Sequence, residues 1–516
     1  MPILGSKNLV NLASASMLPT ELLGEIFNFS YQSSRESLYR CTHNRIEEAC
    51  ECPDEEFVGW REKDTLTTSC HFPDALASVC TKWRELLLTR PHYWTRIVIF
   101  VDEDPALEDL KARLTLTRDL PLSINILRRS GDGNDAEEDE RVRAVMDVIR
   151  LYFPRCYSIR FNLLHSTSLP AVADFRAAGA SLRELKLQCK AYVEDPHYQV
   201  PTAPFPFVVF PEIRVLALNG ETFLDAAKNP TWITETLSKA KPLLSLSIGH
   251  FRPVWNKITY REHRASVYHL LNILTVIPKI VNLEIDDIDA PFSFDDDRNE
   301  ESAIYIRAHH VKLSNLGDEF IDIVMYLSYF QKRSLHITNS SLQFLNSPLV
   351  STITLEKIPS SSEILSRYLS AYTWCDLTLI DCPAFDDQSL EMLMKWSPNS
   401  LRVLRIKNCP NFTVDALREL VKLRKRERIG MGTSRMPWER SGMQWLSVSG
   451  SGPELSLDDA RYLEDNVETF HWNTQREDGP VCGPYGKWCA EDIHAGPASS
   501  GFAEWLKSQI PLPEQS

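Results

Sequence analysis

The chain has 516 residues, which is too long for one ordinary domain and predicts two to four domains or one elongated array. Apolar residues make up 43% of the chain, so a sizeable core can form. The net charge of −14 disfavours a general nucleic-acid binder, because such proteins contact phosphates with Lys and Arg. An acidic surface favours protein partners instead.

Targeting segments and disulfides are not predicted. No apolar run approaches the roughly 18 residues that a membrane-spanning helix needs, and the apolar stretch in residues 1–17 is too broken for a signal peptide. The 12 cysteines are scattered, which favours reduced thiols over a disulfide framework. We therefore expect an intracellular protein, cytoplasmic or nuclear or both, with a flexible N-terminus over residues 1–17.

A short amphipathic helix is predicted in the segment LPTELLGEIF, residues 18–27. Proline suits the first turn of a helix, because its φ is fixed and its missing N–H is not needed there. The apolar residues of this segment follow helical spacing and predict one wide stripe: Leu22, Leu23, Ile26 and Phe27. A helix of about three turns is marginal alone, so it must pack against another element.

A second helical segment lies within residues 72–100, FPDALASVCTKWRELLLTRPHYWTRIVIF. Pro91 ends this helix, and Trp94 continues the apolar pattern beyond it. The apolar residues with helical spacing are Leu76, Val79, Cys80, Trp83 and Leu87.

These two segments together resemble an F-box, a small helical module that docks onto a Skp-family adaptor of a cullin–RING ubiquitin ligase. The overall pattern, including the tryptophan near the end, is similar to the expanded F-box families of mushroom-forming fungi. The resemblance implies a module over residues 18–98 whose adaptor-binding residues are Leu18, Pro19, Leu22, Leu23, Ile26, Phe27, Val79, Cys80, Trp83, Leu87 and Trp94.

The chain departs from the F-box pattern in one respect. The two halves are normally separated by a few residues, whereas here a polar insertion at 31–71 lies between them. Such a segment can loop out, because the entropic cost of loop closure grows slowly with length. Whether the insertion leaves the adaptor surface accessible stays open, and the alternative is that both segments are core helices of an N-terminal domain.

Residues 99–475 contain an internal repeat of strand-like pieces with the form L-x-x-L-x-L, separated by helical patterns. The clearest copies have their apolar residues at Leu182, Leu185 and Leu187; Ile213, Leu216 and Leu218; Leu243, Leu246 and Ile248; Ile280, Leu283 and Ile285; Trp374, Leu377 and Leu379; and Leu401, Leu404 and Ile406. The repeat predicts an α/β fold, a curved leucine-rich-repeat solenoid with a parallel sheet on its concave side and one continuous core.

Two cysteines in this region are predicted to be buried. Cys382 and Cys409 each follow the last apolar residue of a strand by three positions, which resembles the cysteine-containing repeat subtype that is common in F-box proteins. We interpret them as small apolar core residues and not as ligands. Acidic segments at 131–140 and 294–301 should be exposed and mobile, because their composition cannot form a core. The Gly/Pro-rich tail at 476–516 is predicted to cap the last repeat.

No catalytic, cofactor or metal site is predicted. The phosphate-binding loop and the common nucleophile and zinc motifs are absent from the sequence. The insertion contains Cys41, His43, Cys50, Cys52, Cys70 and His71, which is enough for zinc in number, but no C-x-x-C pair. We therefore interpret these residues, and Cys482 and Cys489 in the tail, as unpaired. The basic run at 422–428 is interpreted as a solvated face after a helix that ends at 423. The alternatives are a nuclear-localisation or nucleic-acid patch, or a contact for an acidic ligand.

The sequence thus favours a non-catalytic substrate-recognition subunit of a Skp–cullin–F-box ubiquitin ligase. Its partners would be the adaptor, the ligase that the adaptor joins, and an unidentified protein substrate; we expect a monomer outside that complex, without membrane or nucleic-acid contact and without a cofactor. Two alternatives remain. One is a leucine-rich-repeat scaffold or cofactor that binds partners without ubiquitination, and the other is an enzyme in the insertion or the tail.

Overall fold

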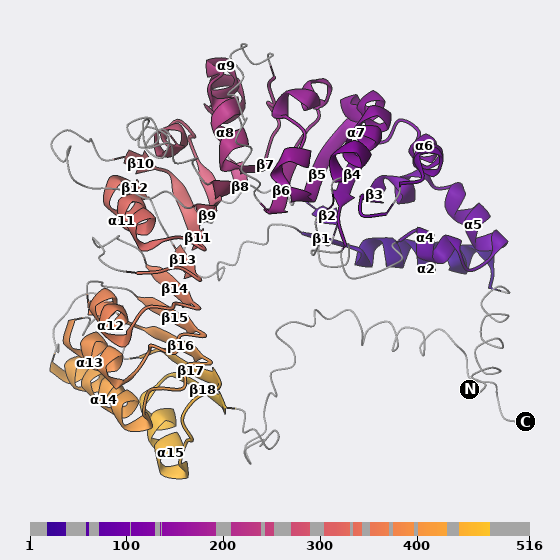
Figure 1. The fold of residues 1–516 in the computed structure, drawn as a ribbon. Coiled ribbons are helices and arrows are strands. Elements are labelled where there is room, and N and C mark those ends of the chain that lie inside the picture. Colours follow the sequence, from indigo (N-terminus) through magenta and orange to yellow (C-terminus); the bar gives the residue numbers. More distant parts are fainter. Residues whose placement is uncertain are drawn as a thin grey trace, which may run out of the picture. The chain divides into compact units, whose positions relative to one another are not determined.

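A computed structural model describes residues 18–37, 58–60, 72–103, 105–129, 135, 137–191, 208–238, 243–251, 270–288, 304–330, 334–342, 351–370, 375–396, 401–430 and 443–474. The chain divides into two compact units: unit 1 comprises Met1–Thr89 with Gln475–Ser516, and unit 2 comprises Arg90–Thr474 (Figure 1). The division falls before residue 98, the predicted end of the module, so that Trp94 belongs to unit 2.

The described part of unit 1 is mainly helical. Its elements are α2 (Thr20–Ser33), β1 (Arg35–Ser37), β2 (Val58–Trp60), α4 (Asp74–Ala77) and α5 (Thr81–Leu88). The predicted insertion begins inside α2 and not after it, since the helix continues to Ser33. Strands β1 and β2 pair in antiparallel register, which holds the two ends of segment 38–57 together.

Unit 2 is built on one parallel sheet of 14 strands among the described residues. The strands are β3 (Arg96–Phe100), β4 (Leu122–Leu127), β5 (Cys156–His165), β6 (Glu184–Ala191), β7 (Val215–Asn219), β8 (Leu243–Phe251), β9 (Ile280–Ile288), β11 (Ala308–Ser314), β13 (Ser334–Thr338), β14 (Thr352–Glu356), β15 (Asp376–Ile380), β16 (Val403–Lys407), β17 (Trp445–Gly450) and β18 (Thr469–Thr474). They follow one another in chain order, and the sheet does not close. The predicted α/β class is therefore confirmed.

Helical segments connect these strands and lie along one side of the sheet (Figure 1). They are η1 (Pro91–Trp94), α6 (Leu107–Leu116), α7 (Glu138–Ile149), η2 (Arg150–Arg155), η3 (Ser166–Ser168), η4 (Val172–Ala178), α8 (Gly220–Ala227), α9 (Pro230–Trp232), η5 (Ile233–Ser238), α11 (Asp318–Leu327), α12 (Ser362–Ser370), α13 (Asp387–Trp396), α14 (Val414–Gly430) and α15 (Leu457–Asn466). A second, two-stranded parallel sheet of β10 (Ile304–Ile306) and β12 (Ser328–Phe330) was not predicted.

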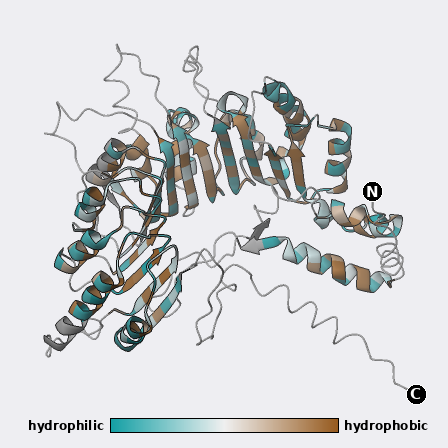
Figure 2. Ribbon diagram, turned by 60° about the horizontal axis from the view of Figure 1, so that its bottom comes forward, coloured by the Kyte–Doolittle hydropathy of each residue, from teal (hydrophilic) through white to brown (hydrophobic). Residues whose placement is uncertain are grey.

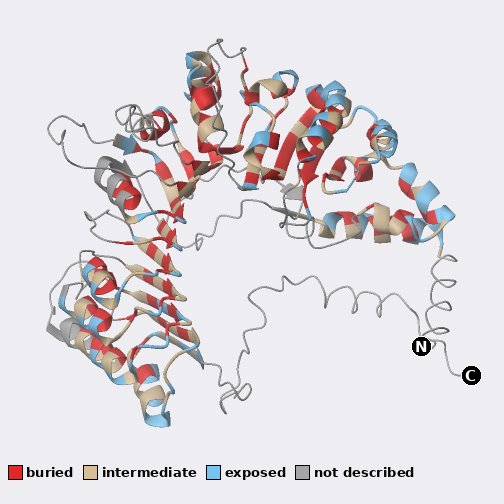
Figure 3. Cartoon of the chain, in the orientation of Figure 1, coloured by how far each residue is buried: buried red, intermediate tan, exposed pale blue. Residues whose placement is uncertain are grey.

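The core of unit 2 consists of apolar residues in register from strand to strand. Each strand directs at least two apolar residues, at positions i and i+2, towards the helices, since side chains alternate across a sheet. Leu216 of β7, for example, pairs with Leu185 of β6 and Leu246 of β8, and all three are buried. Figures 2 and 3 show the result, with apolar and buried residues recurring along the strands of this sheet from β3 to β17. We call this side the apolar face and the opposite side the polar face.

A ladder of residues in the left-handed conformation ties the strand ends together. Each lies two positions after the last core residue of its strand and has a φ between 46° and 73°: His250, Asp287, Asn315, Asn339, Lys357, Asp381, Asn408 and Gly450. Asn and Asp tolerate this conformation better than most residues. Asn339 Nδ2 donates to Asn315 Oδ1 at 2.6 Å, and Asn408 Nδ2 donates to Asp381 Oδ1 at 2.7 Å.

The ladder also uses the backbone. The N–H groups of Asn339, Lys357 and Asp381 donate to carbonyl groups of the following strand at 2.8–2.9 Å. At the last position only glycine fits, because a Cβ on Gly450 would lie 1.7 Å from Asn408 Oδ1. Sequence analysis did not identify this ladder, although its residues recur at a constant distance from the core leucines.

Lys357 is the unfavourable residue in the ladder, because the other positions hold Asn, Asp, His or Gly, which adopt the left-handed conformation more readily than Lys. Lys357→Asn should raise stability by about 1 kcal/mol, since Asn adopts this conformation at lower cost. Thermal unfolding of the purified chain measures the change. Lys357→Val is the matched control and should lower stability, because β-branched residues are strained at positive φ; a lower unfolding temperature for Lys357→Asn would contradict the role of the ladder.

Leu404 of β16 lies in the core between Leu377 of β15 and Leu446 of β17 and has no exposed surface. Leu404→Asp should unfold the neighbouring repeats, because it places a charge in their shared core without a partner. Thr378→Asp is the control, since Thr378 lies on the polar face of β15 and is only partly buried. Circular dichroism and limited proteolysis should detect a loss of structure in the first variant alone.

Candidate functional site

The candidate docking site of unit 1 rests on a small core between α2 and α5. Phe27 and Trp83 pack edge to face with ring centroids 5.2 Å apart, and Leu23 and Leu87 are fully buried. Lys82 Nζ donates to the carbonyl oxygen of residue 18 at 2.8 Å, which holds the start of α2 against α5. These contacts bring together the two segments that the sequence separates by the insertion.

Exposure divides the predicted adaptor-binding residues into two groups. Five are buried: Leu23, Phe27, Trp83 and Leu87 in unit 1, and Trp94 in unit 2. Six are exposed or partly exposed: Leu18, Pro19, Leu22, Ile26, Val79 and Cys80. The buried members stabilise the unit itself, and the exposed members are the ones that are accessible to a partner; adaptor binding by this set stays a prediction.

The apolar residues of α2 in fact occupy two faces. Leu23, Phe27 and Tyr31 lie at i, i+4 and i+8 and are buried. Leu22, Ile26 and Phe29 lie at i, i+4 and i+7 and form a second face, on which Leu22 is 48% and Phe29 46% exposed. We call this second set the exposed stripe. Phe29 was not predicted as a site residue, although its spacing from Leu22 is helical.

The exposed stripe extends over about 10 Å of helix, from residue 22 to residue 29. Val79, in the turn before α5, is 39% exposed, and Leu88, at the end of α5, is 37% exposed. The insertion leaves α2 at its far end, where Arg35 Nη1 donates to Tyr31 Oη at 2.6 Å. Along the helix axis this point lies roughly 20 Å from Leu22.

The possible zinc ligands of the insertion and the cysteines of the tail lie outside the described residues, as do residues 1–17, 294–301 and 476–516. Within the described ranges, no group of three His, Cys, Asp or Glu side chains is placed to hold a metal. None of the described helices is long and apolar enough to cross a membrane. Cys382 and Cys409 are fully buried, as predicted.

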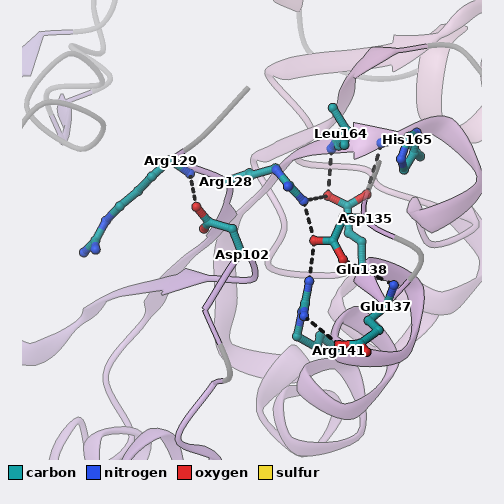
Figure 4. A network of polar contacts seen from close by, with 9 residues as sticks. All are labelled: Asp102, Arg128, Arg129, Asp135, Glu137, Glu138, Arg141, Leu164 and His165. Carbon is teal, nitrogen blue, oxygen red and sulfur yellow. Dashed lines mark hydrogen bonds and ion pairs between the residues drawn. The ribbon is translucent and has the colours of Figure 1, made fainter. Parts of the chain in front are cut away.

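A buried polar network in unit 2 corrects the expectation for the acidic segment at 131–140 (Figure 4). Glu138, at the start of α7, has no exposed surface. Its carboxylate accepts the backbone N–H groups of Leu164 at 2.8 Å and His165 at 3.0 Å, and Arg128 Nη1 lies 3.5 Å away. The end of this segment is therefore a structural element that fixes the end of strand β5, and it is not an exposed loop.

Asp135 completes the network. Arg128 Nη1 lies 2.6 Å from its carboxylate, and Arg141 pairs with the same carboxylate. Burial acts to raise the pKa of Asp135, but the Arg128 hydrogen bond, the charge of Arg141 and the backbone N–H of Glu137 outweigh burial and lower the pKa below its usual value of 3.8. Ionised Asp135 is therefore favoured in the folded state.

The basic run at 422–428 also differs from its expectation. Helix α14 continues to Gly430, so the run lies inside a helix and not after one. Arg424 is only 5% exposed, and Lys422 Nζ lies 2.7 Å from Glu419 Oε1. The interpretation as a solvated face is thus wrong for Arg424.

The polar face of the sheet carries charged and polar side chains that are largely paired between neighbouring strands. Arg160 on β5 contacts Glu184 on β6 at 2.8 Å, and Lys312 on β11 contacts Glu284 on β9 at 2.7 Å. His310 Nδ1 lies 2.7 Å from Ser334 Oγ, which agrees with a structural role for that histidine. Charged and polar groups on this face are therefore largely paired with a group on a neighbouring strand.

Comparison with other proteins does not identify the chain: no model of a known protein family matches it, and no curated protein matches it.

The pairing of Asp135 predicts an acid-dependent loss of stability. A group whose folded-state pKa is depressed contributes stability above its unfolded-state pKa, and this contribution disappears as the pH falls through the folded-state pKa. Asp135→Asn should therefore destabilise the chain by about 1–3 kcal/mol at neutral pH and by much less at about pH 3. Thermal unfolding at both pH values measures the difference.

Glu137→Gln is the matched control, because Glu137 pairs with the same Arg141 but its side chain is 78% exposed. Exposed ion pairs contribute little, so this variant should unfold like the wild type at both pH values. An equal destabilisation by Asp135→Asn at neutral and acidic pH would show that the network does not act through ionised Asp135.

Proposed function

We propose that this chain is an F-box protein with leucine-rich repeats and serves as the non-catalytic substrate-recognition subunit of a Skp–cullin–F-box ubiquitin ligase. The observation that carries the proposal is the second apolar face of α2. A helix that needed only to pack inside unit 1 would use the Leu23 and Phe27 face alone, and its other face would be polar.

The exposed stripe has the chemistry of a helix-docking surface. Burying a large apolar side chain contributes roughly 1.5–3 kcal/mol, so Leu22, Ile26 and Phe29 together could anchor a partner. Val79 adds a further apolar residue from the other half of the motif. The F-box resemblance implies a Skp-family adaptor as the partner. The core between α2 and α5 supports this proposal, because it joins helices from both half-motifs in one unit despite the insertion.

Unit 2 supports the second part of the proposal. Its strands direct apolar residues in register towards the helices, and strands β8, β9, β11 and β13 to β17 end in a left-handed residue, a pattern that stacked repeats would produce. Such an array would hold a substrate on its surface while unit 1 binds the adaptor. Catalysis would arise from proximity, because tethering raises the effective concentration of a substrate lysine near a charged ubiquitin-conjugating enzyme.

Co-purification with the Skp-family adaptor of the host tests the adaptor contact. The wild type should form a one-to-one complex, and Leu22→Asp with Val79→Asp should reduce its affinity about 100-fold or more, because two charges would be placed in an apolar interface. Asp at position 22 lies in the first turn of α2, where a carboxylate suits the helix dipole. The double variant should therefore remain folded.

Leu457→Asp is the matched control, since Leu457 is 69% exposed at the first position of α15 in unit 2 and the substitution is chemically identical. It should bind the adaptor like the wild type. Trp83→Ala is unsuitable as a docking variant, because Trp83 packs on Phe27 in the core. Its loss would lower the free energy of unfolding by about 3–5 kcal/mol. The proposal would be refuted if the variant Leu22→Asp with Val79→Asp still binds the adaptor, or if the wild type does not bind it.

A further inference from the structure

Strand β16 differs from the rest of the polar face, because it presents two cations without carboxylate partners. Arg405 and Lys407 are both exposed, and neither forms an ion pair with any of the described residues. On β5 to β11, by contrast, the basic side chains Arg160 and Lys312 each contact a carboxylate on a neighbouring strand. The two β16 cations are therefore available to an external anion.

Aromatic and hydroxyl side chains complete the surroundings of these cations. The guanidinium carbon of Arg405 lies 5.7 Å from the ring centroid of Trp445, and that ring lies 5.0 Å from the ring of His471 on β18. The residues directly opposite the two cations on β17 are small: Ser447 faces Arg405, and Ser449 faces Lys407. Small neighbours leave space beside each cation, and their hydroxyl groups can donate hydrogen bonds.

The spacing of the cations matches an extended peptide. Residues i and i+2 of one strand lie about 6.6–7 Å apart on the same face, so Arg405 and Lys407 are separated by the same distance as alternate side chains of an extended ligand. A ligand with oxyanions at alternate residues could therefore contact both cations at once. Arginine favours carboxylates and phosphates, because its planar fork binds two oxygens.

We propose that the surface formed by Arg405, Lys407, Trp445, Ser447, Ser449 and His471, the β16–β18 patch, binds an extended peptide with oxyanions at alternate residues. The oxyanions are carboxylates of Asp or Glu, or the phosphates of phosphoserine. The chain as a whole carries a net charge of −14, so a cationic patch is a local exception that attracts an acidic segment. The role of this peptide as part of a substrate rests on the proposed function, but its binding does not.

Three fluorescein-labelled peptides of about ten residues test the proposal by fluorescence anisotropy with the full chain. They share one Gly/Ser sequence and carry Glu, phosphoserine or Gln at two alternate positions. The Glu or the phosphoserine peptide should bind at least about tenfold more tightly than the Gln peptide, and the preference should weaken as salt is added. The tighter of the two anionic peptides identifies which oxyanion the patch favours.

The double variant Arg405→Gln with Lys407→Gln should abolish the preference, while the control variant Arg176→Gln with Arg461→Gln should retain it. The control also removes two positive charges, but from exposed positions on η4 and α15. The test and control variants therefore have the same net charge. Equal unfolding temperatures show that both are folded.

Three results would overturn the proposal: no preference for either anionic peptide, an equal loss in the control variant, or tighter binding of a single-stranded oligonucleotide that the test variant abolishes. Because no adaptor is present, the result is separate from the adaptor experiment. If the chain binds the peptide but not the adaptor, the β16–β18 patch is established, and only the proposed role as a substrate receptor is refuted.

Discussion

The structure of unit 2 depends on the register between parallel strands. Each strand offers only a few core residues, and these are buried because the neighbouring strands place their own core residues beside them, as Leu185 and Leu246 do on either side of Leu216. Parallel strands must leave the sheet and return by a crossover, so the helices necessarily lie along the apolar face. No strand with its following helix has a complete core of its own, so stability depends on contacts between neighbouring strands and helices.

The strand ends face a second constraint, because the chain must turn sharply there while its backbone groups remain hydrogen-bonded. From β8 to β17 the left-handed ladder meets both needs, since its N–H groups bond to the next strand and its Asn and Asp side chains bond to one another. Near β5 a different solution is found: the carboxylate of Glu138 accepts two backbone N–H groups. A charged side chain is buried there because its hydrogen bonds and Arg128 compensate for its desolvation.

The sequence predicts the strands well, since the period of two in segments such as LRELKL and LRVLRI reflects the alternation of side chains across the sheet. It predicts α2 less well. Successive helical residues point about 100° apart, so Leu22 and Leu23 belong to different faces, and only the structure shows which face is buried. The burial of Glu138 could not be predicted, because its partners at residues 164 and 165 are close to it only in the folded chain. The ladder was predictable in principle from the constant spacing between core residues and polar ends.

The two candidate surfaces rely on different physical interactions. The exposed stripe of α2 is apolar, so its binding free energy would come from desolvation, which added salt does not weaken. The β16–β18 patch relies on exposed cations, whose attraction for an anionic peptide is screened over about 10 Å at moderate ionic strength. For the proposed substrate receptor this difference would be useful: apolar contacts would hold the adaptor persistently, while screened contacts would allow a substrate to exchange. The charge of the peptide, and hence its phosphorylation, would then control occupancy of unit 2 without altering the surface of unit 1.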